Sequence, residues 1–139
     1  MNGVIAVRSL LVGDLRVTTL VLPERIAAGT LPQGIVLPAI ALTSIGSTDR
    51  NIPSPGPKRR VSERVQVTVL ARAYPEAKAI ITAVRAAAAD RMPAIDGLTE
   101  VTVQTDSAGP DFLDEETGIH MQTQDFRVSF NEARLASPS

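Results

Sequence analysis

The sequence predicts an α+β domain, with a mostly antiparallel sheet of four to five strands and two helices packed on one of its faces. Two observations lead to this prediction. The first is a unit at residues 61–93, in which a strand pattern runs directly into a helix pattern. The second is that segments on both sides of this unit alternate apolar and polar residues, as strands with one buried face do.

The central unit is the clearest element of the chain. Val65, Val67 and Val69 recur with a period of two, which places them on one face of a strand. Pro75 follows at the expected first helical position, where its fixed φ is favourable and its missing N–H needs no partner. The helix is expected to end before Pro93. Its buried stripe is predicted from residues at helical spacing: Ala77, Ile80, Ile81, Val84, Ala87 and Ala88.

The N-terminal segment predicts a short amphipathic helix over residues 4–11, ended by Gly13 and Asp14. Residues 15–22 are ambiguous. Their β-branched residues favour a strand, while the spacing of their apolar residues also allows a helical turn.

Two further strands are expected before the central unit, a short one at residues 25–28 and a longer one at residues 35–45. In the longer strand Ile40 and Leu42 share a face, whereas Ile45 is out of phase with them. This change of phase indicates a bulge.

Residues 46–60 read GSTDRNIPSPGPKRR and are predicted to form one long loop. The three prolines and two glycines disfavour regular structure, and the serine, threonine and aspartate residues suit turns. A loop of this length inside a compact domain is usually functional or disordered.

The C-terminal part predicts a strand at residues 98–106, an acidic turn-rich segment at residues 107–118, and a last strand at residues 119–130. The apolar residues of the last strand change face near residues 123–124. We therefore expect a bulge there, or a strand that crosses between two packing environments.

Composition places the chain among ordinary globular proteins. With 139 residues, it is expected to form a single domain over residues 1–131, followed by a polar tail at residues 132–139. A formal net charge of −1 gives no overall attraction to nucleic acid or to an anionic membrane. The absence of cysteine excludes disulfides and thiolate metal sites. Because we find neither a signal peptide nor a membrane-spanning stretch, we expect a soluble cytosolic product.

No catalytic set is recognisable. His120 is the sole histidine, and no partner that would make it a general base is identifiable. A cluster of carboxylates suggests calcium or magnesium, but its spacing does not match an EF-hand, so a solvated acidic loop is the favoured interpretation. The cluster comprises Asp106, Asp111, Asp114, Glu115 and Glu116.

A basic cluster lies on and beside the expected long loop and comprises Arg50, Lys58, Arg59, Arg60 and Arg64. It could attract phosphate, meet an acidic surface on another subunit, or serve as the solvated base of a loop. Basic and acidic surfaces on one chain are what a head-to-tail ring uses, because one protomer's positive surface meets its neighbour's negative one. The sequence therefore suggests a ring as one hypothesis.

Several segments, read together, resemble the tail terminator, or tail completion, proteins of long-tailed bacteriophages, prophages and gene transfer agents. The most specific is DFLDEETGIHMQTQDFRVSF near the C-terminus, followed by RVQVTVLARAYPEAKAIITAVRAAA in the centre. VIAVRSLLVGD and LPQGIVLPAIAL near the N-terminus complete the match, so the resemblance covers nearly the whole chain.

The resemblance implies a structural virion protein. Such proteins form a homohexameric ring on the head-proximal end of the tail tube, end tube polymerisation, and join the head connector or stopper protein. DNA passes through the lumen without sequence-specific binding, and assembly occurs in the host cytoplasm. The family implies no enzymatic activity, no cofactor, no metal and no membrane contact. Its loops implicate these residues in subunit or tube contacts: Arg50, Lys58, Arg59, Arg60, Asp111, Asp114, Glu115 and Glu116.

Other interpretations remain open at this stage. A neighbouring neck protein, which connects head and tail, fits the same resemblance. A small ligand-binding module on a ferredoxin-like sheet fits the fold class, although the chain lacks a glycine-rich anion loop and has few aromatic residues. An enzyme ranks third, because no residues converge on His120.

Overall fold

The computed structural model describes residues 2–29, 31, 34–50 and 58–133, and it contains one five-stranded sheet in the order β1-β2-β3-β5-β4. β1 runs parallel to β2, and every other pair of neighbouring strands is antiparallel. The strands are β1 (Ile26–Ala28), β2 (Ala39–Arg50), β3 (Lys58–Ala71), β4 (Leu98–Asp114) and β5 (Ile119–Ala133). The predicted α+β class is confirmed.

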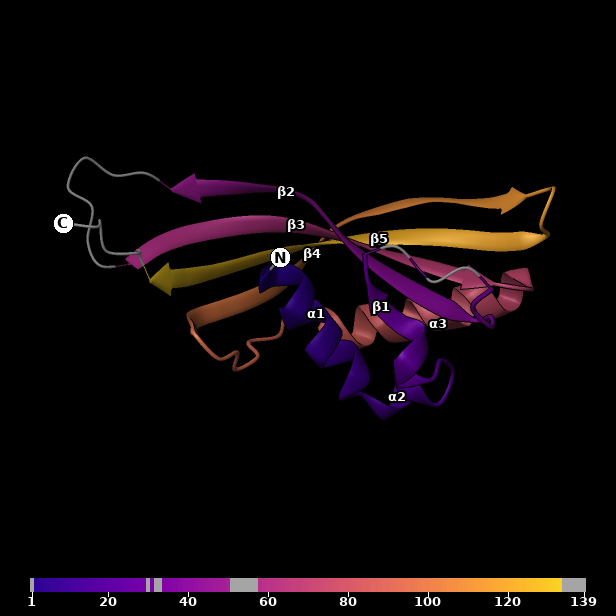
Figure 1. The fold of residues 1–139 in the computed structure, drawn as a ribbon, viewed down its shortest axis with the longest axis horizontal. Coiled ribbons are helices and arrows are strands. Elements are labelled where there is room, and N and C mark those ends of the chain that lie inside the picture. Colours follow the sequence, from indigo (N-terminus) through magenta and orange to yellow (C-terminus); the bar gives the residue numbers. More distant parts are fainter. Residues whose placement is uncertain (1, 30, 32–33, 51–57, 134–139) are drawn as a thin grey trace.

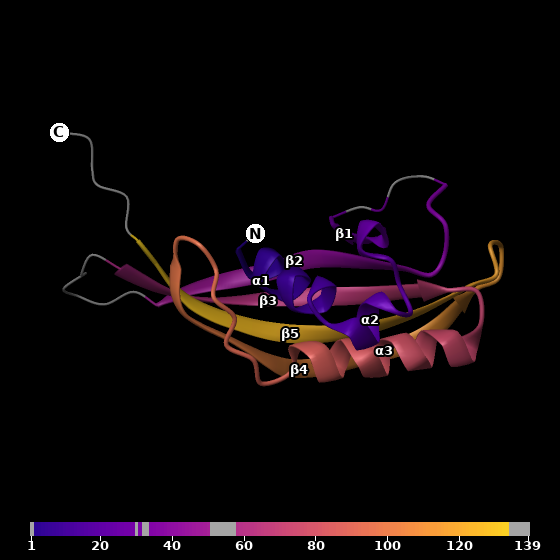
Figure 2. The ribbon, with the colours of Figure 1, turned by 90° about the horizontal axis from the view of Figure 1, so that it is seen from below.

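The helices lie together on one face of this long, twisted sheet, as Figures 1 and 2 show. They are α1 (Asn2–Val12), α2 (Leu15–Thr18) and α3 (Tyr74–Ala88), followed after α2 by a 3₁₀ turn at Pro23–Arg25. The two longer helices are the two that the sequence predicts. The hydrophobic core lies between the helices and the sheet, and its largest buried side chains are Phe126 and Phe130.

The central strand-helix unit is confirmed as β3 followed by α3. Val65, Val67 and Val69 are fully buried toward the helices, and Pro75 stands in the first turn of α3. The helix ends at Ala88, earlier than Pro93 requires. The helix thus ends before Pro93 as expected, but the backbone is already extended at Ala89, so the proline is not what ends it.

The ambiguous segment at residues 15–22 begins as a helical turn, α2. Asp14 caps its N-terminus, because its carboxylate accepts a hydrogen bond from the Arg16 backbone N–H at 2.8 Å. The Arg16 guanidinium also donates to this carboxylate at 2.7 Å, and this contact lowers the pKa of Asp14 to about 2. The cap favours the helix over the strand that the β-branched residues suggested.

The predicted long loop at residues 46–60 is wrong at both ends. β2 continues to Arg50 and β3 begins at Lys58, and their pairing extends to Arg50 opposite Arg60. The expected bulge is confirmed between Ser44 and Gly46, and beyond it the strand resumes. All three prolines fall within residues 51–57, outside the described part of the chain. Pairing with β3 therefore overrides the weak strand propensity of residues 46–50.

The acidic segment at residues 107–118 is also more regular than predicted. β4 continues to Asp114, and only residues 115–118 form a turn. Register shifts on either side of Ala108 show that β4 accommodates its Gly109-Pro110 pair by bulging. A proline is tolerated because β4 is the edge strand of the sheet.

The bulge predicted near residues 123–124 of the last strand is absent from the pairing of β5 with β3, which runs without a shift. Gln122 and Gln124 occupy buried positions in phase with Phe126, so the buried face is continuous. The apparent change of face arose because these core-facing positions hold glutamines. β5 also runs to Ala133, into the segment that we expected to be a polar tail.

Candidate subunit interface

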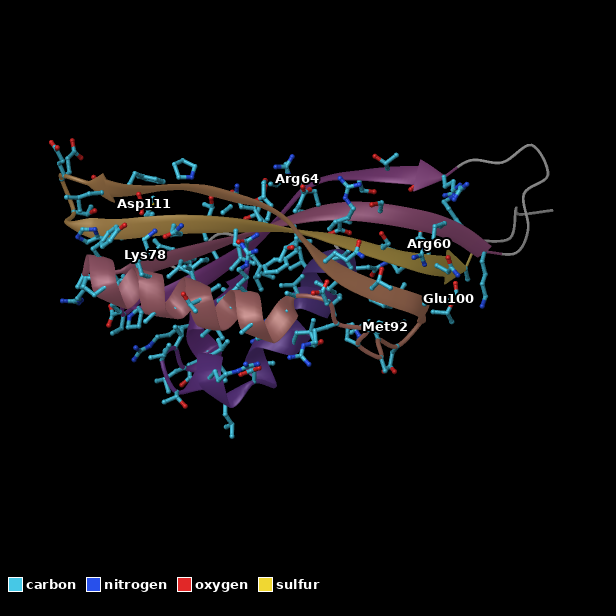
Figure 3. All side chains as sticks on the ribbon, turned by 180° about the vertical axis from the view of Figure 1, so that it is seen from behind. Arg60, Arg64, Lys78, Met92, Glu100 and Asp111 are labelled. Carbon is cyan, nitrogen blue, oxygen red and sulfur yellow. The ribbon has the colours of Figure 1, made fainter. Side chains whose placement is uncertain are left out.

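The charged residues singled out from the sequence gather at opposite ends of the long sheet. The basic end comprises Arg50 at the end of β2 and Lys58, Arg59 and Arg60 at the start of β3. The acidic end comprises Asp111 and Asp114 of β4 together with Glu115 and Glu116 of the turn before β5. Figure 3 shows the separation, with Arg60 near one end and Asp111 near the other. Each end therefore carries one sign of charge from the predicted set.

At the basic end, the Arg60 side chain forms hydrogen bonds with the edge strand β4 and with β5. Its guanidinium donates to the backbone carbonyl of Glu100 at 2.9 Å and to the Asn131 side chain at 3.3 Å. Glu100 has a positive φ of 53°, a backbone conformation that is uncommon for a residue other than glycine. Arg60 thus stabilises an irregular part of β4, and its guanidinium donates hydrogen bonds to groups of its own chain.

The other basic residues differ in the contacts that their side chains make within the chain. Lys58 donates to the Thr99 hydroxyl at 3.4 Å, and the Arg59 guanidinium lies 3.8 Å from the Asp49 carboxylate. Arg50 has no side-chain hydrogen bond or ion pair within the described ranges. This end therefore presents a partly compensated positive surface.

At the acidic end, Asp111 fastens β4 to the start of α3. Its carboxylate accepts hydrogen bonds from the Lys78 ammonium at 2.7 Å and from the Tyr74 hydroxyl at 2.8 Å. The Lys78 ammonium also lies 5.1 Å from the centre of the Tyr74 ring, and His120 meets that ring edge-on. The bond to Lys78, and then that to Tyr74, lowers the pKa of Asp111. Asp111 is therefore a structural clamp.

The remaining acidic residues differ in whether their carboxylates contact other described residues of the chain. Asp114 accepts a hydrogen bond from the backbone N–H of Glu116 at 3.1 Å, and so it shapes the turn. The carboxylates of Glu115 and Glu116 are exposed, and no cation or hydrogen-bond donor among the described residues contacts them. They are the two carboxylates of this end that are available to a partner.

Replacing Lys78 by Met is expected to raise the pKa of Asp111 toward its ordinary value of 3.8. In the native chain the depressed pKa means that the clamp stabilises the fold above about pH 4, and that this contribution is lost as pH falls through the native pKa. Carboxyl NMR titration of Asp111 would measure the change. Lys58→Met, at the other end of the sheet, is the matched control and should leave the Asp111 midpoint unchanged. An unaltered midpoint in Lys78→Met would contradict the clamp.

A second charged cluster, which the sequence analysis did not assemble, lies midway along the open face of the sheet. Arg64 of β3 donates to the buried carboxylate of Asp125 of β5 at 2.6 Å and to the Ser107 hydroxyl at 3.1 Å. Asp106 lies 3.7 Å from Arg64 and 3.6 Å from Arg127. The sequence analysis grouped Arg64 with the basic cluster and Asp106 with the acidic cluster, because each is close to those residues in the chain. Their contact joins two different strands, so neighbours in the sequence did not reveal it.

A polar connection also joins the helix layer to the bulged part of β4. Arg85 of α3 donates to the buried side-chain oxygen of Gln124 at 3.3 Å, and the amide of Gln124 donates to the Ser107 carbonyl at 3.3 Å. The Gln124 side chain of β5 thus links α3 to the neighbouring strand β4. This contact explains why a polar residue occupies a core-facing position of β5.

The described residues were also compared with the requirements of a metal site and of a membrane-spanning helix. No group of three or more His, Asp or Glu side chains among them is placed to hold a metal ion. No helix in the described ranges has the length and apolar character needed to cross a bilayer. His120 is half-buried against Tyr74.

Comparison with known proteins identifies relatives by family and by fold. The family model described as "Tail completion protein gp17" matches residues 5–130. A solved structure, "Virion of native gene transfer agent (GTA) particle", contains a chain with a similar fold, with a TM-score of 0.67 and 16% sequence identity. The match covers 92% of this chain and 93% of that one. No curated protein matches.

Proposed function

The chain belongs to the tail completion protein gp17 family, and from this premise we propose that it forms a ring on the head-proximal end of a tail tube. The ring ends polymerisation of the tube protein and offers the surface to which the head connector or stopper protein binds. The observation that carries this proposal is the family match over residues 5–130, which spans nearly all of the domain. The protein acts as a homohexamer in the virion and is assembled in the host cytoplasm.

The arrangement of charge supports assembly into a ring. Because the basic and acidic ends lie at opposite ends of one sheet, contact between them on successive copies is heterologous. Heterologous contacts close into a ring when the rotation between neighbours is an integral fraction of a full turn. Opposite charges also favour the correct orientation of approach. The interface residues proposed from the sequence thus remain part of this model, with Glu115 and Glu116 as its most available members.

The proposed role is structural. The ring needs no cofactor or metal, and its subunits contribute no catalytic residues. DNA passes through the lumen without sequence-specific contacts. A neck protein that joins head and tail without limiting tube length is the second candidate, since it fits the same resemblance.

Deletion of the gene is expected to give overlong tails of variable length that are not attached to heads. The physical reason is that tube subunits continue to add when nothing covers the growing end. Electron microscopy of the resulting particles measures tail length and attachment. Tails of normal, uniform length that lack heads would favour the neck protein. Normal complete particles would rule out both roles. Complementation with the intact gene is the control.

A further inference from the structure

A pocket on the open face of the sheet brings two arginines together. It has a volume of about 480 Å³, and it lies over β2, β3 and β5. By strand register, Arg64, Arg127, Thr48 and Ser62 share the face on which it opens, and no carboxylate is among its lining residues. The two guanidinium groups are the charged groups of this lining and suit a carboxylate, while Asp106 and Asp125 lie beside them, outside the lining.

The strand register explains how the pocket forms. Gly46, Arg64 and Arg127 occupy one row across three neighbouring strands. Like charges directly opposite on adjacent strands are destabilising, and here Asp106 lies near both guanidinium groups. Gly46 adds no side chain to this row, and a Cβ built on it would meet no atom within 4 Å. The hollow above Gly46 is therefore open.

The two arginines differ in how closely carboxylates of their own chain hold them. Arg64 is held by the Asp125 carboxylate at 2.6 Å, whereas the contact of Arg127 with Asp106, at 3.6 Å, is beyond hydrogen-bond distance. The side chain of Arg127 is 59% exposed. Arg127 thus keeps its donors available for a carboxylate from outside the chain.

We propose that the acidic turn of a second copy of this chain, through Glu115 and Glu116, docks into this arginine pocket. The proposal rests on the proposed ring and names its contact between subunits. Charge complementarity selects the occupant, because the turn presents two exposed carboxylates without a cation among the described residues. The receiving surface is then the middle of the open sheet face, in place of the basic end at Arg50 and Lys58 to Arg60.

The pocket cannot receive the acidic turn of its own chain. From Ile119 to Arg127 the strand β5 extends for eight residues, or about 26 Å at ~3.3 Å per residue. The contact is therefore between chains. Since it joins two different surfaces, each copy can donate a turn to one neighbour and accept one from the other, as a closed ring requires.

Disulfide trapping tests this contact, and the chain helps because it has no cysteine of its own. Thr117→Cys in the acidic turn is combined with Thr48→Cys, which lies opposite Ser62 on the same face of the sheet as Arg64, and both changes leave every charge in place. Oxidation of the concentrated protein is expected to give a ladder of covalent multimers on a non-reducing gel. A disulfide requires Cα atoms about 4.4–6.8 Å apart, so it reports direct docking. The matched control combines Thr117→Cys with Thr99→Cys, which lies at the basic end.

Two further variants test the physical cause. Glu115→Gln with Glu116→Gln removes the charge of the turn, and Gly46→Val fills the hollow at a strand position where the fold has room. Each is expected to lower the yield of multimers from the Thr117→Cys, Thr48→Cys protein at least tenfold. Cross-linking at Thr99 with none at Thr48 would overturn the proposal in favour of the basic end.

The outcome separates this proposal from the proposed function. If the wild-type protein forms rings by electron microscopy and the Thr117→Cys, Thr48→Cys protein gives no multimers, the docking contact is wrong and the ring stands. If deletion of the gene leaves particles normal, the proposed function is wrong. Salt-sensitive retention of duplex DNA that Arg127→Gln abolishes, without multimers through Thr48→Cys, would assign the pocket to phosphate and overturn the docking contact.

Discussion

Replacing Phe126 by Ala is expected to destabilise the protein by about 3–5 kcal/mol, the usual cost of removing a buried phenylalanine ring. Phe126 is fully buried in the middle of β5, opposite Val65 of β3, and its ring is among the largest side chains of the core. A domain of this size is typically stable by about 5–15 kcal/mol. The substitution would therefore remove a large part of the stability and lower the Tm by roughly 10–20 °C.

Thermal unfolding followed by circular dichroism measures this loss. Phe112→Ala is the matched control, because Phe112 is 50% exposed on β4 and its removal should change stability by less than about 0.5 kcal/mol. If the alanine variant does not fold, Phe126→Leu takes its place. Leucine loses less volume, so the Tm of this variant should lie below that of Phe112→Ala by less than the full loss expected for Phe126→Ala. Equal Tm values for Phe126→Ala and Phe112→Ala would show that the buried face of β5 is wrongly placed.

Replacing Gly3 by Ala is expected to destabilise the protein by about 1–3 kcal/mol, the range for overpacking a core. In an exposed helix this change normally stabilises by up to about 1 kcal/mol, because alanine favours the helix. Here a Cβ on Gly3 would lie 2.7 Å from a carboxylate oxygen of Glu63 and 3.0 Å from a methyl group of Val65. Both neighbours are buried in β3, and Glu63 also accepts a hydrogen bond from the Gly3 backbone N–H at 3.1 Å. The steric cost therefore exceeds the helical gain.

Chemical denaturation gives the sign of this effect. Gly46→Ala is the matched control, since the same methyl group would enter open space and should leave stability unchanged or slightly raised. A Gly3→Ala protein as stable as the wild type would mean that α1 does not pack closely on β3 at its first turn.

Much of the fold follows from short-range patterns in the sequence. The alternation of Val65, Val67 and Val69 determined which face of β3 is buried, and the spacing of apolar residues after Pro75 determined α3. The phase change at Ile45 located the bulge of β2. These features are readable because the strand and helix periods are set by local backbone geometry.

The errors share one cause. Residues 46–50 and 107–114 look like loops because they are polar and rich in glycine or turn formers, yet both are paired strands. Their partners lie in distant parts of the chain, and pairing outweighs local propensity. Gln124 misled the assignment of β5 for the same reason, since Arg85 and the Ser107 carbonyl satisfy it in the core.

The sequence by itself determined the α+β class, the central strand-helix unit, and the presence of basic and acidic groups on one chain. Only the tertiary structure decided what each charge does. It assigns Asp111 to Lys78 and Tyr74, Arg60 to the irregular start of β4, and leaves Glu115 and Glu116 without a cation among the described residues. Periodicity depends on neighbours in the chain, whereas the partner of a charge depends on which strands and helices lie side by side.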